Sequence, residues 1–173
     1  MSEIKTRPTL LRRAAGSADE PWLKRLFAQL RGLDAAMIEA CPALLEQQWQ
    51  LQQRIFASDF PGARTELLLL DGEPIGVLTI DEGPNSLRIV EIGLEANQRG
   101  RGIGECLLRE VIAHADHLGK ALELAVMRHN PAVRLYQRLG FESLPGVPDE
   151  AQWQMRREPA QPAGSLRNAS NSR

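Results

Sequence analysis

The segment NQRGRGIGECLLREV, residues 97–111, places three glycines within five positions and then continues as an amphipathic helix. Glycine lowers the stability of regular structure because it loses more conformational freedom on folding than other residues. Gly100, Gly102 and Gly104 nevertheless stand where a helix must begin, with an arginine on either side of Gly100. A glycine-rich turn before a helix gathers backbone N–H groups around one point, which together with the helix dipole binds anions such as phosphate. The segment therefore predicts an anion-binding loop, with a solvated surface turn as the alternative.

The elements on either side of this loop alternate between strand and helix. Residues 86–94 (SLRIVEIGL) are predicted to form a strand before the loop, and residues 103–118 a helix after it, ended by Gly119. Residues 121–126 (ALELAV) are too short and too apolar for anything but another strand. A strand–helix–strand connection is nearly always a right-handed crossover between parallel strands. The strands at 86–94 and 121–126 are therefore predicted to be parallel neighbours.

Helical periodicity and turn residues predict the remaining elements. Helices are expected at 19–30 and at about 42–57, and the glutamine-rich tract EQQWQLQQR of the second is interpreted as its exposed flank. Asn130, Pro131 and Gly140 occupy the cap, the first position and the C-terminal end of a further helix. Short strands are expected at 9–14, on both sides of Asp71-Gly72 as a hairpin, at 141–145 and at 151–157.

This order of elements predicts the fold class and the extent of the domain. We expect an α/β fold of the α+β kind, with a mixed central β-sheet flanked by helices on both faces. A single domain is expected over residues 1–158. Residues 159–173 have almost nothing to bury and are expected to form a disordered C-terminal tail.

Composition and charge narrow the class of protein. The chain has 173 residues, 43% of them apolar and 25% charged, with a formal net charge of −1. These values are typical of a globular domain and predict no overall attraction to nucleic acid or to a membrane surface. Cys41 and Cys106 are expected to be reduced thiols, with Cys106 packed in its helix. We find neither a signal peptide nor a run of about 20 apolar residues, so a cytoplasmic location is predicted.

Two other classes of phosphate-binding loop fit the spacing poorly. A nucleoside triphosphate loop needs Lys followed by Ser or Thr after its last glycine, whereas Ile103-Gly104-Glu105 stands here. A dinucleotide loop needs a third glycine five positions after Gly100, where the chain has Glu105. Glu123 lies at about the right distance for a ribose ligand, but inside a predicted strand rather than at its end. Both alternatives are therefore disfavoured.

Residues 99–104 (RGRGIG) fit the pattern R/Q-x-x-G-x-G/A, and the chain resembles the GNAT N-acetyltransferase superfamily through this motif. The resemblance extends to the preceding strand IVEIGL, to the following helix and strand, and to the segment NPAVRLYQRLGF. It covers roughly residues 65–142 strongly, whereas the first 60 residues agree only in the order of elements.

The resemblance implies acetyl-CoA as co-substrate. In such a protein the backbone amides of residues 99–104 would bind the pyrophosphate, the arginine side chains being secondary. Backbone groups of the strand would contact the pantetheine arm and the thioester carbonyl, and Asn130 would contact the arm while capping its helix. The implied cofactor-binding residues are Ile92, Gly93, Leu94, Arg99, Gly100, Arg101, Gly102, Ile103, Gly104 and Asn130.

The resemblance also implies the reaction, direct attack of an amine on the thioester in a ternary complex. Tyr136, the only tyrosine, occupies the position where many relatives keep a general acid, although it could instead pack with neighbouring leucines. Glu91 shares a strand face with Leu87, Ile89 and Gly93 and is a candidate general base. Alternatively, Glu91 pairs with Arg88 or with a more distant arginine in a structural role.

The acceptor and the partners are less defined. A small-molecule or peptide amine is expected, in a pocket built mainly by residues 19–60 and 143–157. Four acidic residues of the first segment either favour a cationic amine or are simply solvated: Asp34, Glu39, Glu46 and Asp59. His114 and His117 lack a third ligand, so no metal site is expected. A homodimer is expected by family analogy only, and a non-catalytic acyl-CoA sensor or partner-binding module is the alternative function.

Overall fold

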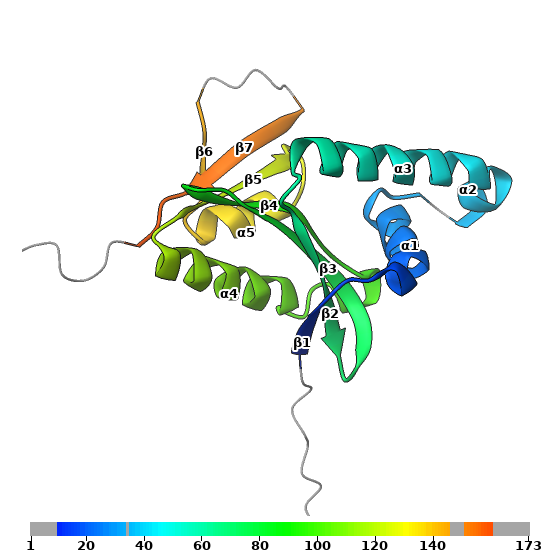
Figure 1. Cartoon of the computed structure of the whole chain (residues 1–173), viewed down its shortest axis with the longest axis horizontal. Coiled ribbons are helices and arrows are strands. Elements are labelled where there is room, and N and C mark those ends of the chain that lie inside the picture. The colour runs from blue at the N-terminus through cyan, green and yellow to red at the C-terminus, as the bar shows by residue number, and fades with distance from the viewer. Residues whose placement is uncertain (1–9, 34, 146–150, 161–173) are drawn as a thin grey trace, which may run out of the picture. The chain divides into compact units, whose positions relative to one another are not determined.

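The computed structural model describes residues 10–33, 35–145 and 151–160, and its strands lie in the order β1-β2-β3-β4-β5-β7-β6 (Figure 1). The strands are β1 (Leu10–Ala14), β2 (Arg64–Leu70), β3 (Glu73–Glu82), β4 (Ser86–Leu94), β5 (Ala121–Met127), β6 (Glu142–Ser143) and β7 (Gln152–Arg157). The helices are α1 (Glu20–Leu30), α2 (Ala35–Ala40), α3 (Pro42–Asp59), α4 (Ile103–Leu118) and α5 (Ala132–Arg138). The mixed α/β fold class is confirmed, and β4 and β5 are neighbours as predicted.

Two units of the chain each have a buried core of their own. The first comprises residues 1–81 and 89–104, and the second comprises residues 82–88 and 105–173. Residues 161–173, most of the expected tail, lie outside the described residues, and the domain boundary at 158 stays a prediction.

In the first unit, the hairpin expected around Asp71-Gly72 is confirmed. Strands β2 and β3 pair antiparallel, and β1 pairs antiparallel with β2. Asp71 and Gly72 both have positive φ, at 51° and 89°. Positive φ at both central residues is the backbone of the two-residue turn whose twist matches that of the flanking strands. The turn therefore has a local cause that the sequence already contains.

Helices α1 and α3 contribute the helical part of the first unit's core. Helix α1 buries Leu26 and Phe27, and α3 buries Trp49, whose ring meets that of Phe27 edge-to-face with 5.6 Å between centroids. Such a pair adds about 0.5–1.5 kcal/mol beyond the apolar area that it buries. The six-residue helix α2 was not expected from the sequence, since its short apolar run covers less than two turns.

In the second unit, α4 and α5 follow the predicted pattern. Helix α4 buries Leu107, Leu108, Val111 and Ala115, which recur every three to four residues as expected. Cys106 is exposed, so its expected packing was wrong: position 106 lies on the other side of the helix from that stripe. The predicted closing strands are confirmed as β6 and β7, and β7 pairs antiparallel with both β5 and β6.

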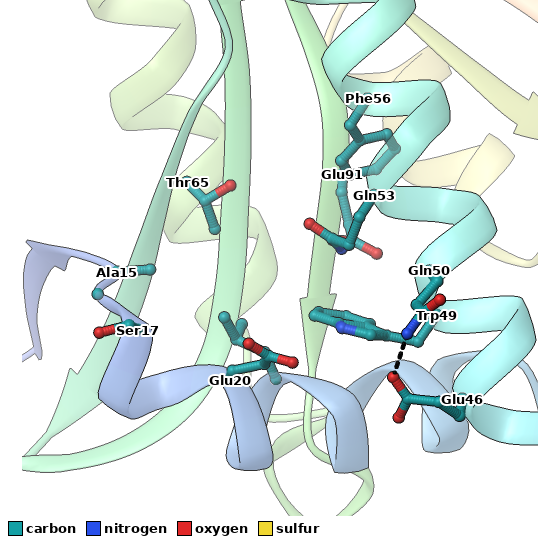
Figure 2. A pocket seen from close by; sticks show the side chains of 12 residues that line it. Ala15, Ser17, Glu20, Glu46, Trp49, Gln50, Gln53, Phe56, Thr65 and Glu91 are labelled. Atoms are coloured by element: carbon teal, nitrogen blue, oxygen red, sulfur yellow. Dashed lines mark hydrogen bonds between the residues drawn. The ribbon is translucent and has the colours of Figure 1, made fainter. Parts of the chain in front are cut away.

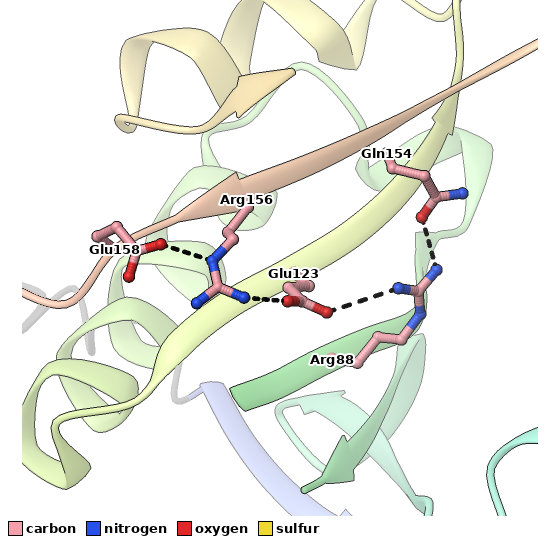
Figure 3. A network of polar contacts seen from close by, with 5 residues as sticks. All are labelled: Arg88, Glu123, Gln154, Arg156 and Glu158. Carbon is pink, nitrogen blue, oxygen red and sulfur yellow. Dashed lines mark hydrogen bonds and ion pairs between the residues drawn. The ribbon is translucent and has the colours of Figure 1, made fainter. Parts of the chain in front are cut away.

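A chain of polar contacts crosses the strands of the second unit (Figure 3). The carboxylate of Glu123 on β5 accepts from Arg156 on β7 at 2.5 Å and lies 3.8 Å from Arg88 on β4. Arg88 also donates to Gln154 at 2.9 Å, and Arg156 pairs with Glu158 at 2.5 Å. Glu123 and Arg156 stand directly opposite each other in the β5–β7 register. Glu123 is therefore held between two arginines, which removes the residue that the dinucleotide alternative needed.

Candidate active site

The glycine loop lies between β4 and α4 in the first unit. Gly100 and Gly102 have φ of 73° and 79°, a backbone region that other L-residues seldom adopt. A Cβ built on either glycine meets no atom within 4 Å, so the outer side of the loop is open. The first N–H groups of α4 have no acceptor within the helix, and the positive end of the helix dipole is located there. A backbone conformation that favours glycine, open space and the free donors of a helix start thus coincide at one turn.

The arginine side chains of the loop bind the chain itself. Arg99 Nε donates to the carbonyl oxygen of Leu94 at 3.0 Å, and this bond joins the loop to the last residue of β4. Arg101 donates to the side chain of Gln98 within the same turn. Both contacts lie within residues 94–101, so the arginine side chains brace the loop against the end of β4.

The end of β4 is closely packed in the first unit. A Cβ on Gly93 would collide with the side chain of Leu30 at the end of α1. A Cβ on Gly76 of β3 would lie 2.6 Å from the carbonyl oxygen of Gly93. Pairing with β3 continues past the strand, since Glu95 donates its backbone N–H to Ile75 at 2.9 Å. The strand Ile92–Leu94 is therefore supported by β3 and by α1.

Glu91 is bonded to Gln52 of α3, and Gln52 is bonded in turn to Arg31 at the C-terminal cap of α1. Gln52 Nε2 on α3 donates to Glu91 Oε1 at 3.1 Å, and Gln52 Oε1 accepts from Arg31 at 2.6 Å. The Arg31 guanidinium also lies over the ring of Phe27, 5.0 Å from its centroid. Burial raises the pKa of Glu91 above its ordinary value, while the Gln52 hydrogen bond and the Arg31 charge act in the opposite direction.

The structure corrects one expectation about the surroundings of Glu91. Gln52 was interpreted as part of an exposed flank, but only 5% of its surface is accessible. Position 52 lies three residues after the buried Trp49, so helical spacing alone could have assigned it to the inner face. No ion pair between Glu91 and an arginine is found among the described residues: Arg31 reaches Glu91 through Gln52, and Arg88 takes part in the Glu123 contacts of the second unit.

A cavity of about 380 Å³ opens beside Glu91 between α1, α3 and β2 (Figure 2). Its wall combines apolar groups from Leu23, Trp49 and Phe56 with the carboxylates of Glu20, Glu46 and Glu91. No lysine, arginine or histidine lines it among the described residues. Of the four acidic residues considered for the acceptor pocket, only Glu46 lines this cavity, and Asp34 lies outside the described residues.

Tyr136 lies in the second unit on α5. It is 7% exposed, and its ring packs edge-to-face on that of Phe141 with 5.7 Å between centroids. Burial raises the pKa of Tyr136, so the phenol stays protonated at neutral pH. Within the part of the chain that the structure describes, its hydroxyl has no hydrogen-bond partner. The phenol is therefore a proton donor without a competing acceptor there.

Asn130 caps α5 as the sequence predicted. Its Oδ1 accepts the backbone N–H of Ala132 at 2.9 Å, and its carbonyl accepts that of Val133 at 3.0 Å. Pro131 already has helical torsion angles. The amide Nδ2 of Asn130 takes no part in this cap, which leaves it available to a ligand.

The comparison with known families shows which family the chain belongs to. Residues 30–141 match the acetyltransferase (GNAT) family. The chain belongs to that family. This GNAT chain is 31% identical over 104 residues to "L-amino acid N-acetyltransferase AaaT" of Escherichia coli (strain K12), covering 56% of this chain and 62% of the relative. It is 34% identical over 82 residues to "Uncharacterized N-acetyltransferase MJ1207" of Methanocaldococcus jannaschii, covering 42% of this chain and 36% of the relative. The alignments thus span less than two thirds of either relative.

Solved structures of other acetyltransferases share the GNAT fold. The PaiA N-acetyltransferase from Thermoplasma acidophilum, in complex with coenzyme A, superposes with a TM-score of 0.63 at 17% identity, covering 87% of this chain and 99% of that one. The histone acetyltransferase HPA2 and related acetyltransferase from Corynebacterium glutamicum has a TM-score of 0.63 at 21% identity, covering 90% and 98%. At such identities the likeness concerns the fold alone.

The first unit of this GNAT chain brings together most of the predicted site. Glu91, the strand Ile92–Leu94 and the glycine loop follow one another there, whereas Asn130 and Tyr136 belong to the second unit. His114 and His117 are exposed on α4. The described residues contain no group of three or more His, Cys, Asp or Glu side chains placed to hold a metal ion, and no helix long and apolar enough to span a bilayer.

Proposed function

We propose that this GNAT protein is an N-acetyltransferase that transfers the acetyl group of acetyl-CoA to a primary amine in a ternary complex. The observation that carries the proposal is the loop at residues 99–104, whose two glycines with positive φ stand before α4. Open space outside both glycines and unpaired N–H groups at the helix start suit a diphosphate. When bound, acetyl-CoA supplies the acetyl group as an activated thioester.

Different residues of the chain bind different parts of the co-substrate in this proposal. Backbone N–H groups from Arg99 to Gly104 hold the diphosphate, and the side chains of Arg99 and Arg101 keep the loop in place. Backbone groups of Ile92, Gly93 and Leu94 hold the pantetheine arm, and one N–H of this strand stabilises the carbonyl oxygen as charge develops there. A donor of this kind contributes about 3 kcal/mol to the transition state. The family resemblance assigns Asn130 to the same arm, and its amide Nδ2 takes no part in the α5 cap.

Glu91 serves as the general base in this proposal. The attacking nitrogen must lose a proton as the nitrogen–carbon bond forms and the carbon–sulfur bond breaks. A carboxylate whose pKa is raised by burial holds that proton better near neutral pH than an exposed glutamate. Gln52 and Arg31 keep this carboxylate oriented on the helix-facing side of β4.

Tyr136 serves as the general acid, the role that the family resemblance assigns to its position. Its phenol is protonated at neutral pH because burial raises its pKa, and it gives this proton to the departing thiolate. Its ring packs edge-to-face on that of Phe141. A cytoplasmic location and a homodimer stay predictions from the sequence.

Melting curves with acetyl-CoA, NAD and ATP in parallel test the co-substrate. A ligand at one hundred times its dissociation constant stabilises the folded state by about 2.7 kcal/mol. For a chain of this length, the melting temperature then rises by roughly 5–10 °C. A rise with acetyl-CoA alone is expected, and a rise with NAD alone would contradict the proposal. Release of thiol when amines are added separates an enzyme from an acyl-CoA sensor, which would bind acetyl-CoA without turnover.

A further inference from the structure

The cavity beside Glu91 has a composition that distinguishes between classes of amine. It holds three carboxylates, from Glu20, Glu46 and Glu91, together with the buried ring of Trp49 and the ring of Phe56. Glu91 is followed directly by the strand Ile92–Leu94, so the cavity adjoins the strand assigned to the thioester. An amine that enters this cavity therefore meets carboxylates and aromatic surface together.

The ammonium group of Lys24 is already engaged by two carboxylates of the cavity. Lys24 lies 2.7 Å from Glu46 Oε2 and 3.5 Å from Glu20 Oε1, so two of the three carboxylates share one ammonium group. Glu46 also accepts from Gln50 at 2.8 Å. The fixed charge around the cavity thus remains negative, and walls of low dielectric strengthen the field that a ligand experiences there.

We infer that the acceptor is a primary amine on an apolar or aromatic body that carries no free carboxylate, an inference that rests on the proposed function. A protonated amine is attracted by the three glutamates and gives its proton to Glu91. An α-amino acid brings a carboxylate into the same cavity, where the glutamates repel it and no lysine, arginine or histidine lines the wall among the described residues. The body of the amine packs on Trp49 and Phe56.

A pair of acceptors that differ only in the carboxylate tests this inference. Phenethylamine and L-phenylalanine have the same aromatic body and amines of similar basicity, and L-phenylalaninamide restores a neutral group at the same carbon. With acetyl-CoA and the full chain, we expect kcat/KM for phenethylamine at least tenfold above that for L-phenylalanine, measured as thiol release. For L-phenylalaninamide we expect a kcat/KM closer to that of phenethylamine than to that of L-phenylalanine. Equal or faster acetylation of L-phenylalanine would overturn the inference.

A charge-gain variant tests the cause of the selectivity. Gln53 is exposed on α3 and lines the cavity, whereas Gln47 is exposed on the same helix and does not line it. Gln53→Arg is expected to reduce the ratio of kcat/KM between phenethylamine and L-phenylalanine at least threefold, with Gln47→Arg leaving it unchanged. The same ratio in both variants would show that the cavity does not select the acceptor.

Failure of the inference and failure of the proposed function give different results. If acetyl-CoA raises the melting temperature and none of the three acceptors releases thiol, the cavity inference is overturned while co-substrate binding stands. If acetyl-CoA neither raises the melting temperature nor reacts, the proposed function is overturned, and the inference with it.

Discussion

Gln52 donates its side-chain amide to Glu91 at 3.1 Å, although 39 positions separate the two residues in the chain. The same amide accepts from Arg31 at 2.6 Å, so one buried glutamine joins the guanidinium at the C-terminal cap of α1 to a carboxylate of β4. Gln52 thereby stabilises the charged form of Glu91 against burial, which acts to raise the pKa of Glu91. Gln52 is a positioning residue, and its role can be measured apart from its contribution to stability.

Replacing Gln52 with leucine keeps the volume of the side chain and removes both hydrogen bonds. Since the Gln52 hydrogen bond lowers the pKa of Glu91, its loss raises that pKa further. The acidic limb of the pH profile of kcat/KM is then expected to move to higher pH. Unfolding in urea should show a loss of about 1–3 kcal/mol, because buried polar groups lose their partner. Gln47→Leu, exposed on the same helix, is the control. A fall in kcat without movement of the limb would indicate a purely structural role.

Glu91→Gln removes the proposed base while preserving shape. Turnover is expected to fall by about 10²–10⁴-fold, the usual contribution of a general base, with the acetyl-CoA melting shift retained. Glu73→Gln, an exposed change on β3, should have neither effect. Full turnover in Glu91→Gln would contradict the assignment of the base.

The pKa shift of Glu91 also predicts a pH dependence of stability. Because the pKa is raised in the folded state, the stabilisation from protonated Glu91 is complete below the ordinary glutamate pKa and is lost as pH rises through the raised value. The free energy of unfolding of the wild type should therefore fall relative to that of Glu91→Gln between acidic and neutral pH. Parallel curves for the two proteins would contradict the shift.

Gly102→Ala tests the loop against a matched glycine. Gly102 and Gly72 both have positive φ, at 79° and 89°, and a Cβ on either meets nothing within 4 Å. Alanine at each position should therefore destabilise the chain similarly, by roughly 1–2 kcal/mol. Only Gly102→Ala is expected to abolish the acetyl-CoA melting shift, because Gly72 lies in the β2–β3 turn. Retention of the shift in Gly102→Ala would remove the diphosphate assignment.

Tyr136→Phe removes one hydroxyl and keeps the ring on Phe141. Stability should change little, since that hydroxyl has no partner within the described part of the chain. Turnover should fall by about 10²-fold or more if the phenol is the general acid. The affinity for acetyl-CoA, measured by titration, should stay within error of the wild type. Unchanged turnover would show that Tyr136 is not the general acid and that its role is packing.

Asp19 gives the cavity rim an acid-sensitive contact. It accepts two hydrogen bonds of 2.7 Å from Arg13 and one of 2.8 Å from the N–H of Gly16, a rim residue. These contacts lower the pKa of Asp19 to about 2, with the Arg13 hydrogen bond the largest cause. The stabilisation is complete above the ordinary aspartate pKa and is lost as pH falls through about 2. Titration followed by NMR should show this low pKa, and a value near 3.8 would contradict it.

Several features of the fold could be predicted because their causes are local. The hairpin at Asp71-Gly72, the Asn130 cap and the apolar stripe of α4 each depend on residues within a few positions of one another. The short helix α2 and the exposure of Cys106 were missed for the opposite reason. The local pattern of α2 is weak, so tertiary packing decides whether it forms a helix. Tertiary packing also decides which face of α4 is buried, and Cys106 lies on the exposed face.

The sequence by itself determined the family, the glycine loop, and the order of strands and helices apart from α2. Torsion preferences of glycine, helix caps and hydrophobic periodicity act over a few residues, so they can be recognised without coordinates. Only the tertiary structure decided what surrounds Glu91. Arg31, Gln52 and Glu91 come from three elements and meet because α1 and α3 pack beside β4, where burial changes the pKa of the carboxylate. The cavity has the same origin, since its glutamates and aromatic rings are brought together by long-range packing that no local pattern encodes.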